Sequence, residues 1–83
     1  MNGTLTRKDI LSAAHEARGQ EIMHYQINID NYTLALQEIE AMPADEAAEL
    51  AGFVDQITNL LASEKLEQKK SKIMLRVIQR QLE

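Results

Sequence analysis

The sequence predicts an all-α fold, an antiparallel hairpin of two long helices that dimerises into a four-helix bundle. Apolar residues recur every three or four positions on both sides of Pro43, as in amphipathic helices. Helix-favouring residues dominate the 83-residue chain, which has one proline and three glycines. We expect residues 1–5 to form a flexible N-terminus and residues 6–83 to form the hairpin domain, with helices over about 6–42 and 44–82.

The two apolar series mirror each other about Pro43 and define a seam between the helices. In an antiparallel coiled coil, each layer joins an a position of one helix to a d position of the other. Positions whose numbers add to 86 are therefore expected to meet, for example Ile29 with Ile57 and Leu36 with Leu50. The seam positions are Leu11, Ile22, Tyr25, Ile29, Tyr32, Leu36 and Ile39, followed by Ala47, Leu50, Val54, Ile57, Leu61, Leu75, Ile78 and Leu82.

The first helix has recognisable start and stop signals. Thr6 is a suitable N-cap, and Asp9 places a negative charge in the first turn, where the helix dipole favours it. Gly19 is the one weak point, at a cost of about 1 kcal/mol relative to alanine. Pro43 disfavours helical geometry at Met42, so the helix is expected to end there or just before.

The second helix begins with acidic residues and ends with basic ones. Asp45, Glu46 and Glu49 lie near its start, where the dipole favours carboxylates. Its later part has the charge that the C-terminal end of a helix favours, carried by Lys65, Lys69, Lys70, Lys72, Arg76 and Arg80.

A polar layer interrupts the seam near the middle of the rod. Arg18 and Glu64 carry opposite charges one layer apart. Such a layer penalises slipped alignments because its groups satisfy one another in only one register, at some cost in stability. A site in the middle of the rod is the alternative interpretation. The members of this polar layer are His15, Arg18, Glu64, Gln68 and Ser71.

One side of the predicted hairpin is apolar and the other is polar. The g positions of the two helices share a side, which a monomer would leave open, and exposed apolar stripes of this kind usually mark an interface. A two-fold homodimer would cover it, although a larger oligomer fits the pattern as well. We call this side the apolar flank, and its interface residues are Ala14, Asn28, Ala35, Met42, Phe53, Leu60 and Met74.

Glu21 and His24 form a Glu-x-x-His pair on the same side as Glu67. Two hairpins packed through their apolar flanks would bring together two such pairs and two further glutamates, the ligand set of a di-metal carboxylate bundle. Lys70 lies nearby and disfavours a bound cation. A di-metal site formed by dimerisation is therefore an alternative function, and we assign no metal ligand or cofactor on this sequence.

Nucleic-acid binding is a third possibility. Basic residues spaced three or four apart within the Lys65–Arg80 stretch could grip phosphates. Interleaved Glu64 and Glu67, the lack of aromatic residues for base stacking and the net charge of −4 argue against it. We call this set the basic stripe, and it consists of Lys65, Lys69, Lys72, Arg76 and Arg80.

The function expected from the sequence is a non-enzymatic protein–protein interaction module. No nucleophile with triad partners, phosphate loop or zinc-ligand spacing occurs, so no catalytic residue is assigned. We expect a small self-associating adaptor, assembly factor or inhibitor that binds itself and another protein, of the kind common in bacteria and their phages. The lack of cysteine and of a membrane span predicts a cytoplasmic protein that does not bind membranes.

Overall fold

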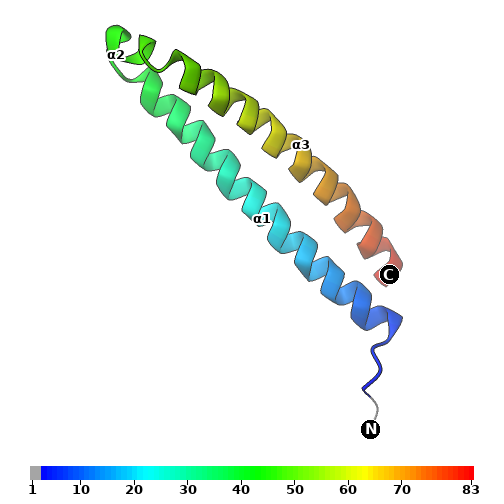
Figure 1. The fold of residues 1–83 in the computed structure, drawn as a ribbon. Coiled ribbons are helices and arrows are strands. Elements are labelled where there is room, and N and C mark those ends of the chain that lie inside the picture. Colours follow the sequence, from blue (N-terminus) through cyan, green and yellow to red (C-terminus); the bar gives the residue numbers. More distant parts are fainter. Residues whose placement is uncertain (1–2) are drawn as a thin grey trace.

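The computed structural model describes residues 3–83, which fold into a helical hairpin. The helices are α1 (Arg7–Glu40), α2 (Ala44–Ala48) and α3 (Ala51–Leu82), and no strand occurs in this range. Helices α1 and α3 run antiparallel side by side, with the short α2 at the turn (Figure 1). The overall dimensions are 68 × 23 × 16 Å, so the molecule is a rod, as the length of the predicted helices implies. Across residues 3–83, no helix is long and apolar enough to cross a membrane.

A reciprocal pair of hydrogen bonds starts α1. The Thr6 hydroxyl accepts a hydrogen bond from the Asp9 backbone N–H at 3.1 Å, and the Asp9 carboxylate accepts one from the Thr6 backbone N–H at 3.0 Å. Thr6 is therefore the N-cap, as predicted, and the pair forms a capping box. These bonds to Thr6 hold the pKa of Asp9 below its usual value of 3.8. Residues 1 and 2 of the expected flexible N-terminus lie outside the described residues.

The sequence predicts one continuous helix from residue 44 onward, but the structure divides this segment into two helices. The segment divides into α2 and α3 at Glu49 and Leu50, whose backbone N–H groups bond to carbonyls three residues back, those of Glu46 and Ala47, at 3.2 and 3.0 Å. Bonds of this 3₁₀ type tighten the backbone and change the direction of the chain. The turn therefore occupies the whole interval between Glu40 and Ala51.

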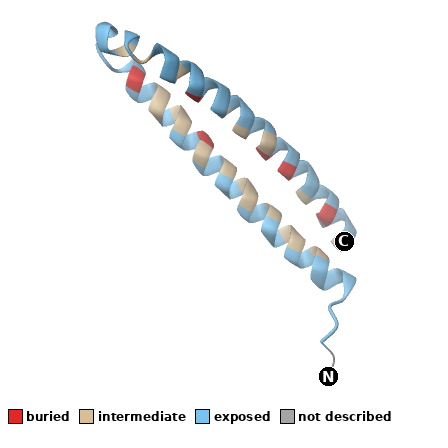
Figure 2. Cartoon of the chain, viewed as in Figure 1, coloured by how far each residue is buried: buried red, intermediate tan, exposed pale blue. Residues whose placement is uncertain are grey.

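The predicted seam is confirmed. All fifteen of its residues are buried or half-buried, and four of them form the apolar core: Ile29, Ile39, Ile57 and Ile78. Figure 2 shows that the buried and half-buried positions line the facing sides of α1 and α3, whereas the outer sides are exposed. One seam between two helices buries little, which is why most seam residues are only half-buried.

The register of the seam differs from the predicted one. Gln68 bonds to the backbone carbonyl of Ile22, the position expected to face Glu64. With this bond, five side-chain hydrogen bonds join α1 to α3, and all five join positions whose numbers add to between 88 and 94 rather than to the predicted 86. The pairing is displaced by about one layer because α2 takes up residues of the turn, which moves the centre of the hairpin from Pro43 into α2.

Candidate interaction surface

The polar layer lies inside the seam. Gln68 and Ser71 are buried, at 7 % and 2 % exposure, whereas His15, Arg18 and Glu64 are half-buried. This placement follows from the heptad spacing, because each residue occupies an a or d position of its helix.

Gln68 and Ser71 join α3 to α1 through hydrogen bonds. The Gln68 amide nitrogen donates to the Ile22 carbonyl oxygen at 3.2 Å and to the Gln26 side-chain oxygen at 2.9 Å. The Ser71 hydroxyl donates to the Glu21 carboxylate. Among the described residues, no buried side-chain nitrogen or oxygen lacks a partner, so this polar layer satisfies its own hydrogen bonds.

The two opposite charges of the polar layer do not pair with each other. Arg18 binds Glu21 on its own helix at 3.2 Å, and Glu64 accepts a hydrogen bond from Asn28 at 3.3 Å. Gln26, an exposed residue beside the seam, was not among the residues expected in this layer.

The apolar flank has small side chains on α1 and larger, more exposed side chains in its other part. Ala14, Asn28 and Ala35 on α1 are half-buried against the neighbouring helix. The other four residues form a more exposed row, with exposed fractions of 37–50 %: Met42, Phe53, Leu60 and Met74. Three of the four lie on α3 at a spacing of seven residues, which places them along one line of that helix.

Two glutamates divide the apolar flank. Glu21 and Glu67 are half-buried there, and Glu67 pairs with Lys70 at 3.0 Å. Partial burial, together with the nearby carboxylates of Glu21, Glu67 and Glu64, raises the pKa of Tyr25 above its usual value of 10.0. The middle of this flank therefore carries two carboxylates, each paired with a basic side chain of its own helix.

Further apolar side chains lie on the outer faces of the helices, and one, Leu5, lies just before α1. They do not take part in the seam, and their exposed fractions range from 42 % to 67 %. They comprise Leu5, Ile10, Met23, Ile27, Leu34, Leu66, Ile73 and Val77.

The metal-ligand candidates remain apart within one hairpin. Glu21 and His24 line a shallow hollow of about 370 Å³ on α1, but Glu67 is not part of its lining. Within residues 3–83, no three histidine, aspartate or glutamate side chains are grouped to hold a metal ion. The Glu21 carboxylate is already engaged by Arg18 and Ser71.

The basic stripe runs along α3 away from the apolar flank. Lys65, Lys69, Lys72 and Arg76 line a shallow groove of about 270 Å³, and Arg80 lies in a neighbouring hollow with Arg76. In the described part of the chain, the only salt bridges are Arg18–Glu21 and Lys70–Glu67, so the stripe forms none.

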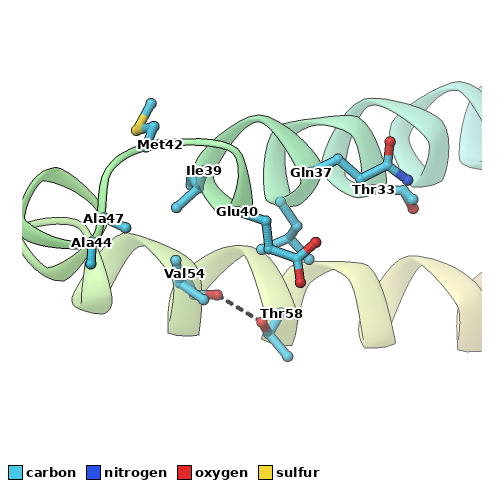
Figure 3. A pocket seen from close by; sticks show the side chains of 10 residues that line it. Thr33, Gln37, Ile39, Glu40, Met42, Ala44, Ala47, Val54 and Thr58 are labelled. Atoms are coloured by element: carbon cyan, nitrogen blue, oxygen red, sulfur yellow. Dashed lines mark hydrogen bonds between the residues drawn. The ribbon is translucent and has the colours of Figure 1, made fainter.

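The largest hollow lies at the turn end and was not anticipated from the sequence. It has a volume of about 620 Å³, and Figure 3 shows the side chains around it. The Thr58 hydroxyl at its edge donates to the Val54 carbonyl oxygen at 2.7 Å, and Glu40 is its only ionisable side chain. The remaining lining residues are Thr33, Leu36, Gln37, Ile39, Met42, Ala44 and Ala47. This lining offers mainly apolar contacts, together with the Glu40 carboxylate and the polar side chains of Thr33, Gln37 and Thr58.

Comparison with known proteins found no matching family model, no matching curated protein and no matching solved structure.

Proposed function

We propose that this chain is a non-enzymatic protein-interaction module, a self-associating helical hairpin that serves as an adaptor, assembly factor or inhibitor. The observation that carries the proposal is the imbalance between buried and exposed apolar side chains. Among residues 3–83, twelve large apolar residues are 37–67 % exposed, whereas four apolar residues are buried. Exposed apolar patches mark interaction sites.

The apolar flank is the surface that we assign to self-association. It combines four exposed large side chains with smaller residues on the adjacent helix, and packing between large and small side chains lets two surfaces interdigitate. Ala14 on α1 leaves room that the larger Met42 of another hairpin can fill. The result would be a four-helix bundle made of two hairpins.

The flank extends along much of α3. It runs there from Phe53 to Met74, 21 residues, so at 1.5 Å per residue it is about 32 Å long. A cytoplasmic location fits a chain without cysteine.

Sedimentation equilibrium at micromolar concentration tests the proposal. We expect a mass of twice the 9.4 kDa of one chain. Leu60→Lys should shift the protein toward monomer, because it would bury an unpaired ammonium group in the interface. Thr58→Lys is the matched control, since Thr58 is exposed on the opposite side of the same helix, and it should leave the mass unchanged. A wild-type protein that is folded by circular dichroism and monomeric would refute self-association.

A further inference from the structure

Charge is divided between the two halves of the rod. Residues 19–63 contain eight acidic residues and no lysine or arginine, whereas residues 1–18 and 64–83 contain all nine basic residues and five acidic ones. Because α1 and α3 are antiparallel, the first set forms the half nearest the turn and the second set forms the open half (Figure 1). The formal charges are −8 for the turn half and +4 for the open half, in agreement with the net charge of −4.

Two members of the apolar flank are equally far from Asn28 in the sequence, one within α1 and one just beyond its end at Glu40. Ala14 and Met42 both lie fourteen residues from Asn28 along the sequence. If a second hairpin lay across this flank in the opposite direction, with a two-fold axis at Asn28, Ala14 of one copy would lie beside Met42 of the other. Asn28 would then lie beside its own equivalent.

Two of the three flank residues on α3, Phe53 and Met74, lie at similar distances from the same level. Asn28 donates a hydrogen bond to Glu64 at 3.3 Å, so these two residues lie at one height along the rod. Phe53 precedes Glu64 by eleven residues, and Met74 follows it by ten. The two-fold axis that suits α1 therefore also places Phe53 of one copy near Met74 of the other.

We propose that a second copy of this chain covers the apolar flank in the opposite orientation, so that the open half of each hairpin lies beside the turn half of the other. This inference rests on the proposed function, because it specifies the orientation of the same dimer. The two-fold axis crosses the rod at the level of the Asn28–Glu64 hydrogen bond.

The glutamates of the flank oppose the other orientation, in which both turns lie at one end. Ser71 donates to Glu21, so Glu21 and Glu67 lie within about one helical turn of each other along the rod. With both turns at one end, Glu21 and Glu67 of the two copies would form one layer of four carboxylates. Like charges juxtaposed in an interface disfavour the association.

The proposed orientation spreads the four glutamates along the rod in place of one layer. Glu67 lies three residues from Glu64, so the two copies of Glu67 would be about 9 Å apart along the rod. Glu21 lies seven residues from Asn28, so the two copies of Glu21 would be about 21 Å apart along the rod at 1.5 Å per residue. That distance exceeds two Debye lengths at physiological salt, each about 8 Å, so their repulsion is largely screened. The halves of opposite charge meet at the same time, which favours the encounter of two hairpins in this orientation.

Distances between spin labels in the full-length dimer test the orientation. The chain has no cysteine, so each single cysteine substitution yields one label per copy. Ala48→Cys places the label at the turn, and Gln79→Cys places it near the open end, both at exposed positions. Asn31→Cys is the matched control, because Asn31 is exposed near the middle of the rod.

The expected distances follow from the helix rise. Gln79 lies fifteen residues from the level of Glu64, so its two labels should be about 45 Å apart, and the Ala48 labels should be at least about 40 Å apart. The Asn31 labels should be closer than about 30 Å in either orientation, which verifies that a dimer has formed.

Each outcome separates the two proposals. A mass of two chains with long Ala48 and Gln79 distances supports the orientation. The same mass with Ala48 and Gln79 distances below about 25 Å overturns the orientation but leaves self-association intact. A monomeric mass with no dipolar signal from any label overturns the proposed function, and the orientation falls with it.

Discussion

Replacing Ile57 by alanine tests the seam directly. Ile57 is the most buried apolar residue of the hairpin, at 3 % exposure, and its side chain lies between α1 and α3. Truncation of a buried isoleucine to alanine costs about 2–5 kcal/mol. We expect a value of about 2–3 kcal/mol here, because a single seam that is open at its sides relaxes more easily than an enclosed core. For a domain of this size, that loss lowers the melting temperature by about 10–20 °C.

The assay is urea unfolding followed by circular dichroism at one fixed protein concentration, since self-association makes the apparent stability depend on concentration. Ile73→Ala is the matched control on the same helix, because Ile73 is 52 % exposed and contributes nothing to the seam. We expect its effect to stay within about 0.5 kcal/mol. If Ile57→Ala cost no more than Ile73→Ala, the burial argument and the seam based on it would be wrong.

Four further substitutions or titrations have defined outcomes. Thr6→Ala should lower the free energy of unfolding by about 1 kcal/mol in urea denaturation, because it removes the cap of α1. The lowered pKa of Asp9 means that its carboxylate stabilises the hairpin above pH 3.8 and that this contribution is lost as the pH falls, so Asp9→Asn should flatten the acid limb of a stability–pH curve. Gly19→Ala should raise the melting temperature, since a Cβ there would meet no other atom, and the gain should be about 0.5–1 kcal/mol. The raised pKa of Tyr25 predicts that its phenol ionises above pH 10 in ultraviolet titration, and that the hairpin loses stability as the pH rises through that range.

The seam could be predicted from sequence because burial follows the heptad period. Every seam residue from Leu11 to Leu82 is at least half-buried, as the spacing of apolar residues requires. The helix start at Thr6 was also predictable, because a capping residue acts through local contacts alone.

The register could not be predicted, because it depends on the path of the turn. The stretch from Ala44 to Leu50 consists of helix-compatible residues with no proline or capping side chain after Pro43, so nothing local indicates the break at Glu49. A displacement by one layer keeps every apolar residue in the seam, so the hydrophobic pattern fits either register.

The hydrogen-bond partners of the polar layer were also not predicted from the sequence. Sequence reasoning placed Arg18 one layer from Glu64, but Arg18 pairs with Glu21, a neighbour on its own helix that is within reach in any register. The hydrogen bond from Gln68 to the Ile22 carbonyl depends on the observed register, so it could not be predicted from the sequence. The hollow at the turn lies where α2 leaves the line of α3, so the pattern that identified its seam residues, such as Leu36 and Val54, gave no sign of the hollow itself.

The corner built by α2 has a consequence for how this protein can vary. Its length determines which residues of the two long helices meet, whereas its side chains are largely exposed. Substitutions there should be widely tolerated among homologues. Insertion or deletion of a single residue would instead misalign every layer of the seam between α1 and α3. Natural variation at this corner is therefore expected to preserve residue number more strictly than residue identity.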